Sequence, residues 1–309
     1  MGFRSVFWKT FTDLTGWKTL LLFAIPLVAL TAVVPTCFML HTENQTHQAA
    51  IDNVTNHFLA VSFLWTAGFF LAFLAAANAA SFVAREESDG TLLLLASKPV
   101  SRRQIVLGKL AALIVRTVLL EALLLTLVAL LFRFALGLEE DALLALLKTI
   151  PWIVMYSFLV VAFFGAIALA LSVLTRNLVA IMVIMSCLIT FCFLMGPLIR
   201  YTLPDAGGTY LDYHLNWIDP SYHLQNSYLL FQKGASGADL VPQYVSGWFG
   251  SNTVVAVPGD AGSLGNRSLW YPVGAAGHVS PAVSVTLLLV IALGATGLAM
   301  WAMQRKEIH

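Results

Sequence analysis

The sequence has little charge, and the charges it has are nearly balanced. Of its 309 residues, 11% are Asp, Glu, Lys or Arg, and the net charge is +1. Soluble domains carry about 25% charged residues, and a nearly neutral chain offers no large basic surface for nucleic acid. Apolar residues make up 59% of the chain. A soluble fold of this length cannot bury so much apolar surface, so we expect lipid to cover part of it.

Two kinds of chemical site are also missing. The three cysteines are Cys37, Cys187 and Cys192. Each lies in an apolar run without CxxC spacing, which favours buried thiols over disulfides or metal ligands. A P-loop for ATP requires Gly-x-x-x-x-Gly-Lys-Ser/Thr, whereas the Gly108-Lys109 pair is followed by Leu110 and lacks the earlier glycine. We therefore predict no catalytic residue, cofactor or metal in this chain, and any ATP hydrolysis must come from another protein.

Long apolar runs are the main positive feature of the sequence. A membrane helix needs about 20 consecutive apolar residues. Six runs qualify, at 19–40, 58–84, 105–132, 150–174, 178–199 and 279–303. They predict an all-α integral membrane protein with six transmembrane helices. We expect Pro151 to lie in the first turn of the fourth helix, where proline is tolerated.

The spacing of these runs divides the chain into four parts: 1–18, 19–199, 200–278 and 279–309. The first places Phe3, Phe7 and Phe11 near helical spacing, which predicts an amphipathic helix along the inner leaflet. The second holds transmembrane helices one to five and a cytoplasmic loop at 85–104. The third is an extracytoplasmic segment, and the fourth is the sixth helix with a cytoplasmic tail.

The segment 200–278 is rich in aromatic residues and predicts a small ordered cap rather than a disordered linker. Within it, Asp219 as a cap, Pro220 at the first position and Gly234 after the end predict a helix over 220–233. Residues at helical spacing on one face of this helix should be buried. They are Leu224, Tyr228 and Phe231.

The distribution of Lys and Arg predicts the orientation. With a cytoplasmic N-terminus, eleven of them lie on the inner side and five on the outer side, as the positive-inside rule requires. Three Asn-x-Ser/Thr triplets, which begin at Asn44, Asn53 and Asn266, also fall on the outer side. We therefore predict a multi-pass protein of the cell membrane with both termini in the cytoplasm.

The loop at 85–104 is the most informative part of the sequence. It is acidic and polar at first, continues as a short apolar helix over 92–96, and breaks at Pro99. Ser101 then caps the next helix. A short apolar helix between two membrane helices has the form of a docking element for another protein. On composition alone, a plain surface loop is an equal alternative.

This stretch resembles the hallmark motif of the permeases of ABC-2 type transporters. The match consists of Glu86, Gly90, Thr91, Leu94, Leu95, Pro99, Val100, Ser101, Arg102, Gly108 and Lys109. A second, weaker similarity begins at Asp219-Pro220. The number and order of the helices resemble the NosY-like branch of the family, and the resemblance covers most of the chain.

The resemblance implies a permease subunit that couples ATP hydrolysis in a separate subunit to export, or to mechanical work on an extracytoplasmic partner protein. It implies two copies of an ABC ATPase, which bind ATP and Mg, and a second permease copy in a homodimer. The loop at 85–104 would be the coupling helix that meets the ATPase. The docking and coupling residues would be Glu86, Glu87, Asp89, Gly90, Thr91, Leu94, Leu95, Pro99, Ser101 and Arg102.

Three polar side chains, Asn78, Arg116 and Glu121, fall inside the predicted membrane helices. Charged groups are unfavourable there, so they indicate either a polar translocation path or structural pairs between helices. The spacing of Arg116 and Glu121 makes direct contact within one helix poor. We therefore expect partners on other helices.

Histidines are the remaining candidates for a chemical site. Six of the seven lie on or near the outer side: His41, His47, His57, His214, His223 and His278. Their spacing gives no metal-ligand pattern, so we expect surface histidines. A metal-handling membrane protein with an outer histidine site is one alternative function. An ATP-independent channel or carrier is another.

Overall fold

The computed structural model describes residues 2–14, 51, 54–55, 58–59, 61–88, 90, 101–175, 177–202, 213–236 and 279–305. Within these ranges the secondary structure is helical and includes no strand. The first predicted membrane helix, 19–40, lies outside them. So do residues 89 and 91–100 of the predicted coupling loop, which include five of the predicted docking residues: Asp89, Thr91, Leu94, Leu95 and Pro99.

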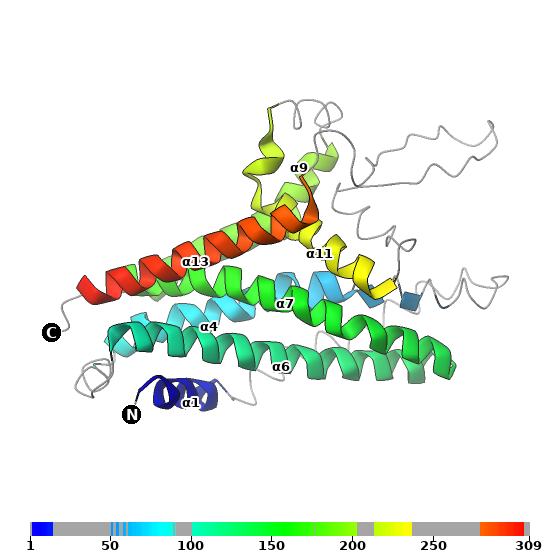
Figure 1. Ribbon diagram of the computed structural model, residues 1–309, viewed down its shortest axis with the longest axis horizontal. Coiled ribbons are helices and arrows are strands. Elements are labelled where there is room, and N and C mark those ends of the chain that lie inside the picture. Colours follow the sequence, from blue (N-terminus) through cyan, green and yellow to red (C-terminus); the bar gives the residue numbers. More distant parts are fainter. Residues whose placement is uncertain are drawn as a thin grey trace.

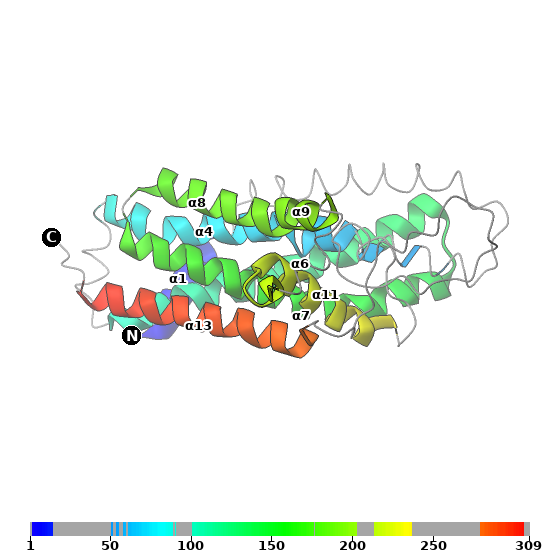
Figure 2. The same ribbon diagram turned by 90° about the horizontal axis from the view of Figure 1, so that it is seen from above.

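The bundle is built from α4 (Phe69–Ser88), α6 (Arg102–Leu136), α7 (Glu140–Leu174), α8 (Leu178–Thr190) and α13 (Pro281–Arg305). Helix α8 continues through the π-helical η2 (Phe191–Met195) into α9 (Gly196–Thr202). Helix α7 is central, because it packs against α4, α6 and α13 (Figures 1 and 2). Its apolar side chains are buried over most of its length, which a fully apolar helix requires in a bundle core.

Five of the described helical segments are long and apolar enough to cross a membrane. They correspond to the second to sixth predicted runs. Helices α6 and α7 have 35 residues each, which is about 52 Å at the usual rise per residue. A hydrocarbon core is about 30 Å thick, so both helices extend beyond it.

The predicted start of the fourth membrane helix is wrong. Helix α7 begins at Glu140 and contains Pro151 in its interior. Proline lacks the N–H that would bond to the carbonyl four residues earlier. Beside it, the hydroxyl of Thr149 donates to the carbonyl of Leu146 at 2.7 Å. Burial of apolar side chains on both sides of Pro151 outweighs the loss of one hydrogen bond, so the helix continues.

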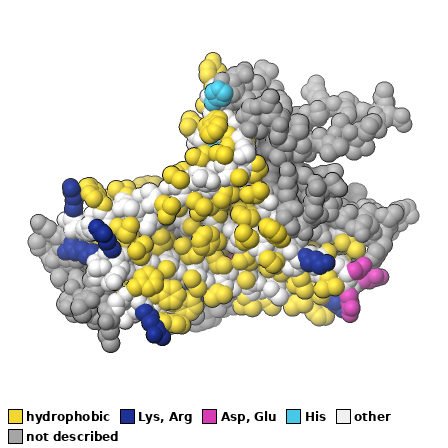
Figure 3. Space-filling view, in the orientation of Figure 1, with side chains coloured by type: hydrophobic (Ala, Val, Ile, Leu, Met, Phe, Trp, Pro, Cys, Tyr) yellow, Lys and Arg dark blue, Asp and Glu magenta, His cyan; other side chains and the backbone are white. Residues whose placement is uncertain are grey.

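The surface of the bundle has the form expected of a membrane protein. Figure 3 shows a broad belt of hydrophobic side chains, with Lys and Arg side chains at one end and both basic and acidic side chains at the other. Large apolar side chains that point outward include Leu119, Leu123 and Val290, each more than half exposed. Water would not favour such a continuous surface, so the chain is a multi-pass membrane protein.

Helix α1 (Phe3–Asp13) lies against α6 at the end of the bundle where α13 also ends (Figure 1). Its buried residues are Val6 and Thr10, while Phe3 and Trp8 remain exposed. A Cβ atom at Gly108 would lie 3.1 Å from the Val6 side chain, so the glycine permits this close approach. Helix α1 is shorter than the predicted 1–18 segment.

Helix α11 (Pro220–Ser236) begins at proline as predicted and packs against α7 and α13 (Figure 1). Its predicted end is wrong, because the helix continues through Gly234 to Ser236. The predicted buried face is confirmed. Leu224 and Tyr228 are fully buried, and Phe231 packs partly buried against the core. Apart from this helix, the described part of the 200–278 segment includes a 3-10 turn, η3 (Leu215–Trp217).

Candidate functional site

The two ends of the predicted coupling loop meet in a buried ion pair. Glu86 lies in the last turns of α4, and Lys109 lies near the start of α6. The Lys109 ammonium is 2.5 Å from Oε2 of Glu86 and donates to the Phe82 carbonyl at 2.6 Å. Lys109 is 3% exposed, so its charge depends on these partners. Lys9 of α1 approaches the other oxygen of Glu86 at 3.9 Å.

We call these four residues, Lys9, Phe82, Glu86 and Lys109, the loop clamp. They fix the end of α4, the start of α6 and the surface of α1 to one another. The two described ends of the segment between α4 and α6 are therefore anchored to one another. Glu86 and Lys109 are both residues of the hallmark motif, and their pairing provides a structural reason for opposite charges at those two positions.

The start of α6 is held by a cap and by a contact with α13. Ser101 accepts a hydrogen bond from the Gln104 N–H at 3.3 Å, and the Gln104 side chain accepts from the Ser101 N–H at 3.2 Å. This capping box confirms Ser101 as the helix cap. Arg102 donates from one nitrogen to the carbonyls of Met303 and Gln304, at 3.0 and 3.1 Å. A cation at the carbonyl end of α13 is favourable.

The other described loop residues lie at the exit from α4. Gly90 has φ of +69°, and its N–H donates to the Glu87 carbonyl at 3.2 Å. Left-handed backbone of this kind favours glycine after a helix end. Glu87 is partly buried in the last turn of α4. Contact of the loop with an ATPase stays a prediction.

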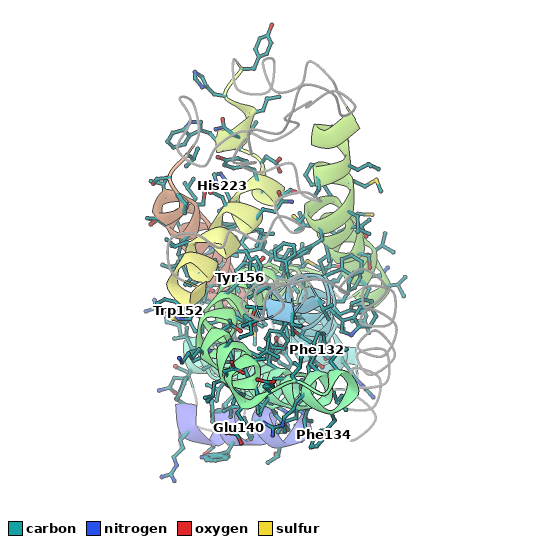
Figure 4. The ribbon with its side chains drawn as sticks, turned by 90° about the vertical axis from the view of Figure 1, so that its right-hand side faces the viewer. Phe132, Phe134, Glu140, Trp152, Tyr156 and His223 are labelled. Atoms are coloured by element: carbon teal, nitrogen blue, oxygen red, sulfur yellow. The ribbon has the colours of Figure 1, made fainter. Side chains whose placement is uncertain are left out.

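A polar network on the far side of the bundle joins α11 to α13. His223 was predicted at the surface, and this is wrong because it is 3% exposed. Its Nε2 donates to the carbonyl of Trp217 at 2.9 Å, because a carbonyl can only accept. Its Nδ1 is hydrogen-bonded to the hydroxyl of Ser284 at 2.9 Å. Figure 4 shows His223 where α11 meets α13.

Other side chains of α11 extend this network. Asn226 donates to the Val279 carbonyl at 2.8 Å and to the Ser284 hydroxyl at 2.9 Å. Ser221 donates to the Cys192 carbonyl in η2 at 2.7 Å, and Tyr228 donates to the Leu59 carbonyl at 2.7 Å. Helix α11 is thus hydrogen-bonded to several segments distant in sequence. It is an integral part of the bundle.

Comparison with protein families identifies the chain. A model described as ABC-2 family transporter protein matches residues 4–308. The chain belongs to the ABC-2 transporter family. A comparison with curated proteins gives no significant match. As an ABC-2 protein with several apolar helices, it is a multi-pass permease component of an ABC transporter. Permeases of this family work with an ABC ATPase and are not themselves catalytic.

A polar path through the residues predicted inside the membrane stays a prediction for this ABC-2 protein. Within the described ranges no hydrogen bond or ion pair joins Asn78, Arg116 and Glu121 to one another. Arg116 is 8% exposed and Glu121 is fully buried. The Glu121 carboxyl lies against the hydroxyls of Thr66 and Ser157. Its neighbours are therefore on other segments, and they are neutral.

The described part of this ABC-2 chain contains no group of three or more His, Cys, Asp or Glu side chains that could hold a metal. His214 is exposed, and His41, His47, His57 and His278 lie outside the described residues.

Sequence reasoning missed the loop clamp as an internal pair. The sequence shows only that the motif has an acid before Gly90 and a lysine after Arg102, which does not by itself indicate that they pair.

Proposed function

We propose that this chain is the permease of an ABC transporter in which a separate ABC ATPase, binding ATP and Mg, drives export of a substrate or mechanical work on an extracytoplasmic partner. The observation that supports this most is the loop clamp. A loop that receives force must transmit it, and a loop with loose ends would absorb the movement. Here both ends are anchored by Glu86 and Lys109.

The clamp also suggests where the movement goes. Lys9 brings α1 to the clamp, and Arg102 attaches the start of α6 to the end of α13. A push on the loop at 85–104 would therefore move α1, α4, α6 and α13 together. At the other end of the bundle, α11 is hydrogen-bonded to α13 through Asn226 and His223. Movement of α13 would reach the extracytoplasmic segment by this route.

The assembly that fits this mechanism has two permease copies and two ATPase subunits, because one coupling loop meets one nucleotide-binding subunit. We propose a homodimer of the NosY-like branch in the cell membrane. The termini and the 85–104 loop face the cytoplasm, in accord with the excess of Lys and Arg on that side. An extracytoplasmic partner would contact the 200–278 segment.

A charged substitution in the apolar part of the loop tests the docking step. Leu94→Asp should prevent co-purification of the ABC ATPase that accompanies the tagged wild-type chain, because an interface core concentrates binding energy in buried apolar contacts. Leu144→Asp is a matched control at the opposite end of the bundle, where Leu144 is 54% exposed. It should retain the ATPase.

Both variants should reach the membrane in normal amounts, which fluorescence-detected size-exclusion chromatography measures. If Leu94→Asp co-purifies with the ATPase and supports full substrate-stimulated ATP hydrolysis, the loop is not the docking element. A chain that never co-purifies with an ATPase in mild detergent would instead favour an ATP-independent channel or carrier.

A further inference from the structure

Glu121 lies in the interior of the bundle at a point where three elements meet. Its side chain is fully buried in α6. The carboxyl lies against the hydroxyl of Thr66, from the π-helical η1 (Ser62–Thr66), and against the hydroxyl of Ser157 from α7. Thr66 and Ser157 are themselves 1% and 0% exposed. Water therefore does not reach this acid in the conformation described here.

The hydrogen bonds that the two hydroxyls already make determine whether they can donate a hydrogen bond to Glu121. A hydroxyl has one proton to donate. Thr66 donates to the Ser62 carbonyl at 3.3 Å, and Ser157 donates to the Ile153 carbonyl at 3.0 Å. While these two bonds are made, both hydroxyls can only accept from Glu121. In agreement, neither Glu121 oxygen accepts a hydrogen bond from the described residues.

Among the described residues, no opposite charge is seen to compensate for a carboxylate at this position. Three described stretches pack around it and contain no Asp, Glu, Lys or Arg: 61–84, 149–174 and 281–304. Their one tyrosine is Tyr156 of α7, whose ring lies within the bundle (Figure 4). Helix α11, which packs on α7, adds Tyr222, His223, Tyr228 and Lys233. Arg116 shares α6 with Glu121, but no charge interaction between them is present.

The segment that carries Thr66 has a distorted backbone. The Ala67 N–H donates to the Ser62 carbonyl, five residues earlier, at 2.7 Å. A Cβ at Gly68 would lie 1.8 Å from the Phe63 carbonyl oxygen, so any other residue would disrupt this turn. Single π-turns often occur at functional sites. The sequence therefore maintains a special geometry beside the residue that meets Glu121.

We propose that Glu121 is a proton-binding site in the membrane core. In this conformation the acid is neutral and donates a hydrogen bond to Ser157 or Thr66, which holds α6, η1 and α7 together. Separation of these elements would remove the acceptor and admit water. A hydrated carboxylic acid loses its proton at neutral pH, so the site binds a proton when the helices are packed and releases it when they part.

Infrared spectroscopy of the full chain in detergent tests the protonation directly. A protonated carboxylic acid has a carbonyl stretching band that is separate from the carboxylate and amide bands. At neutral pH the wild-type chain should show this band, and the band should shift when the glutamates carry carbon-13. The isotope measurement needs no substitution, so it does not depend on the folding of a variant.

Two variants assign the band. Glu121→Gln should remove it, while keeping an amide that can donate to the same hydroxyls. Glu140→Gln is the matched control, because Glu140 is exposed at the start of α7; the band should remain. A band that persists in Glu121→Gln, or its absence from the labelled wild-type chain at neutral pH, would overturn the proposal.

The pH dependence of thermal unfolding gives a second readout with a defined sign. The folded chain keeps the Glu121 proton, whereas the unfolded chain exposes the carboxyl and loses it at neutral pH. Folding therefore takes up one proton, and rising pH disfavours the folded state. The melting midpoint of the wild type should fall relative to Glu121→Gln from mildly acidic to alkaline pH. If the melting midpoints of the wild type and of Glu121→Gln change in parallel with pH, the proposal is contradicted. The proposal does not depend on any ATPase partner.

Discussion

The loop clamp predicts an unequal response when either charge is removed. Glu86→Gln removes the carboxylate that balances the Lys109 ammonium, which is 3% exposed, and leaves it only uncharged acceptors, the Phe82 carbonyl and the new amide oxygen, within contact distance. Stranding one member of a buried ion pair costs about 3–5 kcal/mol. Lys109→Met strands the Glu86 carboxylate, which is 21% exposed and keeps Lys9 at 3.9 Å. For that variant we expect about 1–3 kcal/mol, because the remaining charge is partly solvated.

The double variant Glu86→Gln/Lys109→Met separates this explanation from general damage. It leaves no stranded charge, so it should be more stable than Glu86→Gln alone. The assay is the free energy of unfolding of the purified chain in mixed micelles with increasing denaturing detergent. Arg4→Met, at an exposed position of α1, is the control and should change little. Wild-type stability of Glu86→Gln, or a double variant that shows the sum of both single losses, would refute the clamp.

Two further predictions test the orientation and the outer network. In a cysteine-free background, single cysteines at Asn53 and Gly262 should react with an impermeant thiol reagent added outside sealed cells, and one at Ser97 should not; labelling at Ser97 would reverse the topology. Asn226→Ala removes two buried hydrogen bonds, to the Val279 carbonyl and the Ser284 hydroxyl, and should destabilise the chain by about 1–3 kcal/mol. The same denaturation assay measures this loss, and wild-type stability would show that the network does not hold α11.

The features that could be predicted from the sequence are those set by local pattern. Apolar runs located the second to sixth membrane helices because burial in lipid depends on composition over one segment. Ser101 as a cap and Pro220 as a first residue were also predictable. Their effect depends on backbone groups within one turn.

The features that could not be predicted depend on contacts between distant segments. His223 is buried because α13 brings Ser284 beside it, and no spacing in α11 indicates this. Lys109 pairs with Glu86 because α4 and α6 meet at that height, although each residue alone has the pattern of a surface charge. Pro151 continues its helix because tertiary packing of α7 outweighs local propensity.

The central claim is that this permease works as a pair with two separate ATPase subunits that meet its loop at 85–104. Native mass spectrometry of the complex released from membranes in mild detergent tests it most directly. The account predicts one assembly whose mass equals two copies of this chain plus two copies of an ABC ATPase. The Leu94→Asp variant should leave two copies of the permease alone. A wild-type mass of one permease with one ATPase, or of the permease without any ATPase, would contradict the account.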